Sequence, residues 1–271
     1  MPYTPMQLAE AFIRTGELED ALDALNQQLD ADPHDNTARR LRAQVIARMP
    51  GEDNLRAALA DLDQLTDLTP ADALFRVVTL EQLGDTAAAV TAAARAHAGF
   101  PDDRALAERL FYLVLHHKDY AAGRTLLEKM PQTWNWLHKA GDLAAADGRS
   151  GEAPGYYTAA LADLDARFAP GDDFGQGIRA MILAARARVF ATLGQLAQAD
   201  SDYGAAMALI PDDPLLPFWR GFVAADRGDL LRAGDLLRAA FALASDSIKT
   251  QMRTALAAFH TQGRYTGLSE S

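Results

Sequence analysis

The stretch that decides the fold runs from residue 186 to residue 240 and reads RARVFATLGQLAQADSDYGAAMALIPDDPLLPFWRGFVAADRGDLLRAGDLLRAA. Two of its glycines, Gly194 and Gly228, lie 34 residues apart (228 − 194 = 34). In both copies a small residue precedes the glycine by seven positions and an alanine follows it by five: Ala187 and Ala199, then Gly221 and Ala233. The same spacing recurs around Gly16 near the N-terminus. A glycine between two apolar segments at a fixed period predicts repeated helix–turn–helix units.

The composition favours helices throughout the chain. Of the 271 residues, 49% are hydrophobic and 23% are charged, which is ordinary for a globular protein. Ala and Leu outnumber Val and Ile, and they lose less side-chain freedom in a helix than β-branched residues do. We therefore expect an all-α protein.

Charge and cysteine content exclude several classes of function. The formal net charge is −11, so the chain repels phosphate backbones and we expect no nucleic-acid partner. The absence of cysteine excludes disulfides, thiolate zinc sites and cysteine nucleophiles. We see neither a signal peptide nor an apolar run of about 18 residues, and expect a cytoplasmic protein without direct membrane insertion.

The repeated residues resemble the tetratricopeptide repeat, a 34-residue helix–turn–helix whose two helices cross at small side chains. Small residues occupy three positions of a repeat. They are Ala9 and Ala21 in the first repeat, where Gln28 departs from the pattern; Val77, Ala89 and Ala96 in the third; Gly141, Ala153 and Ala160 in the fifth; Ala187, Ala199 and Ala206 in the sixth; and Gly221, Ala233 and Ala240 in the seventh. A large residue fills the neighbouring space at Leu25, Tyr157, Tyr203 and Leu237, and a proline closes the second helix at Pro33, Pro70, Pro101 and Pro211.

The resemblance implies a right-handed superhelical solenoid of about seven such hairpins plus a C-terminal capping helix. We expect repeats one to five in 1–167, a loop in 168–179, repeats six and seven in 180–245, a capping helix in 246–262 and a flexible tail in 263–271. The second repeat has a longer turn at 49–53, and the fourth is irregular at Lys118. The loop either joins two lengthened helices or forms a hinge near Gly171.

The resemblance also implies that the first helix of each repeat lines a concave groove for an extended peptide or a partner helix. The residues we expect to face it are Arg14, Arg40, Gln44, Arg48, Tyr112, His116, Asn135, His138, Arg188, Phe218 and Phe222.

We expect the groove to carry arginines at one end and aromatic residues at the other. Arg14, Arg40 and Arg48 suit an acidic segment because a guanidinium binds a carboxylate through paired hydrogen bonds. The alternative is that these arginines are solvated or pair with nearby acids. Tyr112, Phe218 and Phe222 would supply apolar pockets.

We find no motif that predicts catalysis, a cofactor or a metal. His116 and His117 are adjacent, so on a helix they point about 100° apart and do not chelate together easily. HExxH, GxSxG and phosphate-binding glycine motifs do not occur. The carboxylate clamp by which some family members bind chaperone tails is also absent, since Met6 and Glu10 occupy its first positions.

The sequence therefore predicts a non-enzymatic protein–protein interaction module, a scaffold or an assembly or adaptor factor. Two alternatives remain open at this point. One is a regulatory protein that changes its superhelical pitch when it binds a peptide, and the other is a self-associating subunit of a larger complex.

Overall fold

The computed structural model describes residues 3–169 and 171–268, and within these residues it contains fifteen α-helices and no strand. Three short segments lie outside the described residues: 1–2 at the start of the expected first repeat, Pro170 in the expected loop, and 269–271 at the end of the expected tail. The helices are α1 (Pro5–Thr15), α2 (Leu18–Ala31), α3 (Asn36–Ile46), α4 (Glu52–Asp63), α5 (Pro70–Gln82), α6 (Thr86–Gly99), α7 (Arg104–His116), α8 (Tyr120–Leu127), α9 (Trp134–Ala146), α10 (Ala153–Arg167), α11 (Asp173–Thr192), α12 (Leu196–Leu209), α13 (Leu215–Asp226), α14 (Leu230–Leu243) and α15 (Asp246–Thr261).

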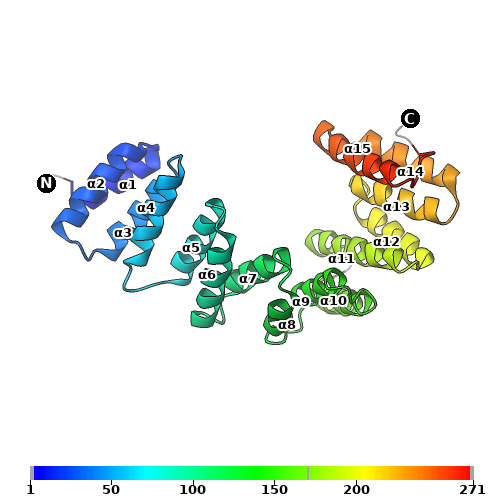
Figure 1. The fold of residues 1–271 in the computed structure, drawn as a ribbon, viewed down its shortest axis with the longest axis horizontal. Helices are drawn as coiled ribbons and strands as arrows, with labels where there is room; N and C mark the ends of the chain where they lie inside the picture. Colours follow the sequence, from blue (N-terminus) through cyan, green and yellow to red (C-terminus); the bar gives the residue numbers. More distant parts are fainter. Residues whose placement is uncertain (1–2, 170, 269–271) are drawn as a thin grey trace. The chain divides into compact units, whose positions relative to one another are not determined.

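Consecutive helices pack as hairpins, as the repeat pattern predicts. The pairs α1 with α2, α3 with α4, α5 with α6, α9 with α10, α11 with α12 and α13 with α14 lie side by side (Figure 1). The small residues named above lie at the crossings, where Ala9, Ala89 and Ala153 are fully buried. The closest approach is at Gly141, where a Cβ atom would lie 2.6 Å from the ring of Tyr157. The all-α architecture of helical hairpins is therefore confirmed.

In most repeats, a residue in the left-handed backbone conformation follows the end of the first helix. Gly16, Gly194 and Gly228 have φ values of 83°, 72° and 83°, which glycine adopts without steric cost. In the fourth repeat Lys118 takes this place with φ at 59°, five residues before the small residue Gly123. The irregular fourth repeat thus keeps the turn conformation without the residue that favours it.

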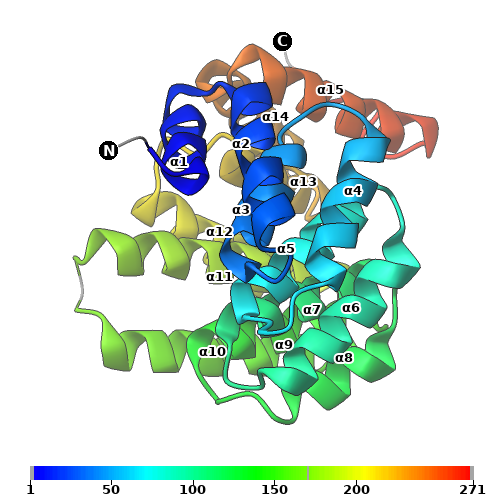
Figure 2. The same cartoon turned by 90° about the vertical axis from the view of Figure 1, so that its left-hand side faces the viewer.

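The chain divides into two compact units, Met1–Asp119 and Tyr120–Ser271. The boundary falls inside the fourth repeat, between α7 and α8, and not near Gly171, where we placed the alternative hinge. Within the second unit, α10 and α11 run side by side on both sides of the Gly171 loop (Figure 2). Leu164 of α10 and Ile182 of α11 belong to one buried cluster, which supports the lengthened-helix alternative.

The expected loop boundary of 168–179 was wrong at its C-terminal side, because α11 begins at Asp173. The carboxylate of Asp172 caps this helix by accepting a hydrogen bond of 2.8 Å from the Gly175 N–H. Gly175 is required there, since a Cβ atom would lie 2.8 Å from the Cβ of Phe168. Gly175, which falls inside the loop we expected, instead permits a close contact in the first turn of a helix.

The C-terminal helix α15 covers the last hairpin, with Met252 and Leu256 buried in the same cluster as Leu237 and Phe241. The expected flexible tail was wrong for residues 263–268. Tyr265 packs against this cluster and Leu268 is only 4% exposed within it. These residues extend the cap because they cover apolar surface that α15 leaves open.

Candidate functional site

A cavity of about 340 Å³ lies in the unit Tyr120–Ser271. The first helices of three successive hairpins, α9, α11 and α13, contribute to its lining, together with α12. Its walls are formed by His138, Asp142, Gly177, Ala180, Met181, Ala184, Ala185, Arg188, Tyr203, Ile210, Asp213, Leu215, Leu216 and Trp219.

The polar side of this cavity comes from α9. His138 and Asp142 lie one helical turn apart, with 3.4 Å between His138 Nδ1 and an Asp142 carboxylate oxygen. The Tyr157 hydroxyl donates a hydrogen bond of 2.7 Å to Asp142. Burial lowers the pKa of His138 below its usual value of 6.5, although Asp142 opposes this, so the ring is neutral at pH 7.

Arg188 of α11 supplies the positive charge of the cavity. Its side chain is exposed, and among the described residues it has no ion-pair partner within 4.0 Å. It lies near enough to the phenol of Tyr203 to favour its ionised form, but burial dominates and raises the Tyr203 pKa to about 12. The cavity therefore combines an unpaired guanidinium with the half-buried ring of His138 and the buried ring of Tyr203.

The rest of the lining is mostly apolar. Met181 is 46% exposed, Leu215 is 38% exposed, and Leu216 and Trp219 also line the cavity. The one further carboxylate among the described lining residues, Asp213, accepts a hydrogen bond of 2.8 Å from the Leu215 N–H. Solvent-exposed apolar side chains beside a free guanidinium can bind a segment that carries both an apolar and an acidic side chain.

Of the residues we expected in a groove, the structure places His138 and Arg188 together in this cavity. Phe218 and Phe222 are only 1% and 5% exposed. Phe222 packs against Phe259 of α15 and against Tyr265, and Phe218 packs against Phe241 of α14. The expectation that they form open apolar pockets was wrong, because both belong to the buried cluster that the last hairpin forms with the cap.

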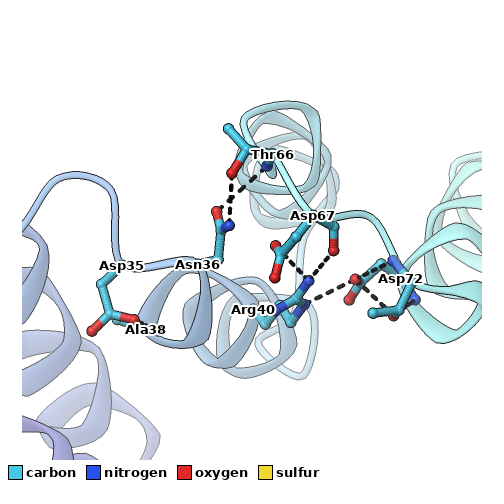
Figure 3. Close-up of polar contacts among 8 residues, drawn as sticks. Asp35, Asn36, Ala38, Arg40, Thr66, Asp67 and Asp72 are labelled. Carbon is cyan, nitrogen blue, oxygen red and sulfur yellow. Dashed lines mark hydrogen bonds and ion pairs between the residues drawn. The ribbon is translucent and has the colours of Figure 1, made fainter.

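In the expected arginine patch of the N-terminal unit, Arg40 is paired with two aspartates (Figure 3). Its Nε donates to the Asp72 carboxylate at 2.9 Å, and its Nη2 donates to the Asp67 carboxylate at 2.8 Å. Burial tends to raise the pKa of Asp72, but hydrogen bonds from Thr69 and Arg40 outweigh it and lower the pKa below 3.8. For Arg40, the alternative of pairing with nearby acids holds.

The other expected residues lie on exposed or half-buried surface outside the cavity. Arg14 and Gln44 are exposed on α1 and α3, and Arg48 lies in the turn that follows the end of α3. Tyr112 and His116 stack on each other with ring centroids 5.6 Å apart. Asn135 accepts a hydrogen bond of 2.8 Å from Lys139. Their role as binding residues remains a prediction.

Sequence reasoning missed a set of arginines that recurs at the repeat period. Arg42 and Arg76 lie 34 residues apart (76 − 42 = 34), as do Arg186 and Arg220 (220 − 186 = 34), and each directly precedes a small residue of its repeat. They pair with aspartates of α4 and α12: Asp61, Asp63, Asp202 and Asp200 in that order. Their spacing of 34 residues is the signal that could have revealed them. The pairs of Arg42 and Arg186 join the two helices of one hairpin, and those of Arg76 and Arg220 join one hairpin to the next.

Within residues 3–169 and 171–268, no three His, Asp or Glu side chains gather as metal ligands. In the same described ranges, the helices are either too short or too polar to cross a bilayer.

No protein-family model and no curated protein matches this chain. Solved structures do. A tetratricopeptide repeat protein from Parabacteroides merdae has a TM-score of 0.57 at 14% identity, over 92% of this chain and 95% of that one. The C-terminal part of a TPR repeat-containing protein from Cytophaga hutchinsonii has a TM-score of 0.61 at 13% identity, over 92% of this chain and 98% of that one. The chain therefore has the fold of tetratricopeptide repeat proteins.

Proposed function

We propose that this chain, with its tetratricopeptide-type fold, is a non-enzymatic interaction scaffold that binds a peptide segment of a partner protein in the cavity between α9, α11 and α13. The observation that carries the proposal is the unpaired guanidinium of Arg188 beside the exposed apolar side chains of Met181 and Leu215. Consecutive first helices present these groups along one surface, as binding of an extended segment requires.

The chemistry of the cavity defines the segment that fits. A carboxylate of the partner, from Asp, Glu or a chain terminus, pairs with Arg188, and such charge-assisted hydrogen bonds are worth about 1.5–3 kcal/mol. An aliphatic side chain two or three residues away covers Met181 and Leu216. Asp142 is already engaged by His138 and Tyr157, so it positions the cavity wall rather than attracting a cation.

A photo-crosslinking residue in place of Met181 tests this proposal. In lysate of the source organism, the crosslinked peptide should carry an acidic residue next to an apolar one. A synthetic copy of that peptide should bind the full chain, and Arg188→Ala should weaken its Kd by about tenfold or more.

Arg238 of α14 provides the matched control. It is an exposed arginine that pairs with Asp235 and lies outside the cavity, so Arg238→Ala should leave the Kd unchanged. Equal effects of the two substitutions, or a crosslinked peptide without a carboxylate, would refute the proposed site.

A further inference from the structure

A second and larger cavity, of about 780 Å³, lies in the other unit, Met1–Asp119. The two helices of a single hairpin, α5 and α6, form its walls, with Leu68 of the preceding linker at its edge. It therefore differs in construction from the cavity of α9, α11 and α13, which lies along successive first helices.

Helix α4 contacts the third hairpin less extensively than α2 contacts α3 or α10 contacts α11. Of the α5 side chains, Phe75 packs against the cluster that holds Ala58 and Leu62 of α4. Leu68, in the linker between α4 and α5, remains 42% exposed. Within the second unit, by contrast, Leu164 of α10 shares a buried cluster with Ile182, Ala185 and Val189 of α11.

Arg40 fixes the linker that borders this cavity (Figure 3). It binds Asp67 within the linker and Asp72 in the first turn of α5, so one side chain holds both ends of the connection. These ion pairs thus fix the course of the linker that carries Leu68.

The α6 wall is smooth enough to receive another helix. Ala88, Ala92 and Ala96 form one row at a spacing of four residues, and Thr91 and Arg95 lie in the neighbouring row. Helices pack by placing side-chain ridges into such grooves. At 1.5 Å per residue, the wall from Ala87 to Gly99 is about 18 Å long, which corresponds to three turns of a bound helix.

The charged side chains that line this cavity are all positive. Arg76 and Arg95 line the cavity and no carboxylate does, although the chain has 37 acidic against 26 basic residues. Arg76 pairs with Asp63 at the edge. Arg95 is exposed and has no ion-pair partner among the described residues.

We infer that this groove, defined by Ala88, Ala92, Ala96 and Arg95, binds an acidic amphipathic helix of a partner protein. The apolar stripe of the helix lies on the alanine row, and an Asp or Glu at its edge pairs with Arg95. A helix fits better than a fatty acid because the groove is open to solvent along Ala87, Thr91 and Gly99.

Selection from a phage-displayed library of random peptides against the full chain tests the inference, with peptides of about 16 residues to span the groove. Enriched peptides should carry apolar residues at helical spacing and at least one acid, and should gain helical circular dichroism on binding. Their Kd should rise by about tenfold or more in Ala92→Trp, which fills the groove, and in Arg95→Glu, which reverses its charge.

Two controls separate this site from others. Ala94 is exposed on α6 outside the cavity, so Ala94→Trp should bind as the wild type does. Arg188→Ala should also bind normally, since it affects only the cavity of the other unit. Arg95→Glu changes an exposed side chain, so it reports on binding even if Ala92→Trp folds poorly.

The inference fails if no acidic amphipathic peptide is enriched, or if the enriched peptides bind Ala92→Trp and Arg95→Glu unchanged. It also fails if Arg188→Ala abolishes their binding. Displacement of a fluorescent fatty acid by oleate that is lost in Ala92→Trp would assign the groove to a lipid instead. Concentration-dependent self-association that Ala92→Trp abolishes would assign it to a second copy.

Discussion

Arg186 of α11 holds Asp202 of α12 through two parallel hydrogen bonds, at 2.7 Å from Nε and 2.9 Å from Nη2. Arg42 of α3 holds Asp61 of α4 in the same way, at 2.8 Å and 2.6 Å. Both pairs join the two helices of one hairpin, and both aspartates are buried. Two parallel hydrogen bonds fix the orientation of the guanidinium, and the carboxylate neutralises its charge.

Replacement of Asp202 by Ala should destabilise the second unit by about 3 kcal/mol, because it leaves the guanidinium of Arg186 without its partner in a site little exposed to water. Urea denaturation followed by circular dichroism measures the loss. Asp235→Ala is the control: it breaks the exposed pair with Arg238 and should change stability by less than about 1 kcal/mol. Similar losses in both variants would contradict this assignment.

Replacement of Gly141 by Ala should cost about 1–3 kcal/mol, because the new methyl group would overlap the Tyr157 ring. Gly155→Ala is the matched control on α10, where a Cβ atom meets nothing within 4 Å. It should be neutral or stabilise the chain by up to about 1 kcal/mol, as expected for glycine in a helix. Thermal unfolding compares them, and a stable Gly141→Ala would show that the two helices can separate at low cost.

The repeat pattern predicted the hairpins well because helix crossing is a local and periodic requirement. Ala9 and Ala89 had to be small, and the sequence shows this directly. Phe222 was misplaced because Tyr265 covers it, and Tyr265 belongs to no repeat. The pairing of Arg40 was left open because Asp67 lies 27 residues away, in a linker whose course depends on packing, and Asp72 lies 32 residues away, in the first turn of α5.

Replacement of Lys118 by Gly should stabilise the first unit by about 1 kcal/mol, because Lys118 occupies a left-handed conformation with φ at 59°. Lys118→Ala should bring no such gain, since it keeps the Cβ atom that causes the steric cost. Urea midpoints of the two variants decide the matter. Equal midpoints would show that the left-handed turn is not strained.

Stability should fall as the pH drops through 6.5, in part because of His138. Burial lowers its pKa in the folded state, so the unfolded chain binds the proton more readily and acid favours unfolding. Above pH 6.5 the ring is neutral in both states and this contribution disappears. His138→Gln should therefore lose less stability than the wild type between about pH 7.5 and pH 5.5. Parallel pH profiles of unfolding free energy would contradict the burial argument.

Replacement of Tyr265 by Ala should destabilise the cap by about 2 kcal/mol, because its ring packs against Phe222 and Phe259 at centroid distances of 4.8 Å and 5.3 Å. Hydrogen exchange should then accelerate in α15 and leave α9 and α10 unchanged. Uniform acceleration across the second unit would instead show that the cap and the hairpins unfold together. Tyr265→Phe keeps the ring and should retain most of the protection.

The arginine pairs of α4 and α12 have a mechanical consequence. Asp61 and Asp63 of α4 are held by Arg42 of α3 and Arg76 of α5, and α12 is held in the same way by Arg186 of α11 and Arg220 of α13. A stack of repeats under tension yields by peeling one hairpin from the next. Peeling at α4 must break the Arg76–Asp63 pair and peeling at α12 the Arg220–Asp200 pair, whereas the Arg42–Asp61 and Arg186–Asp202 pairs keep each peeled hairpin closed. We therefore expect force to separate hairpins from one another before it opens any of them.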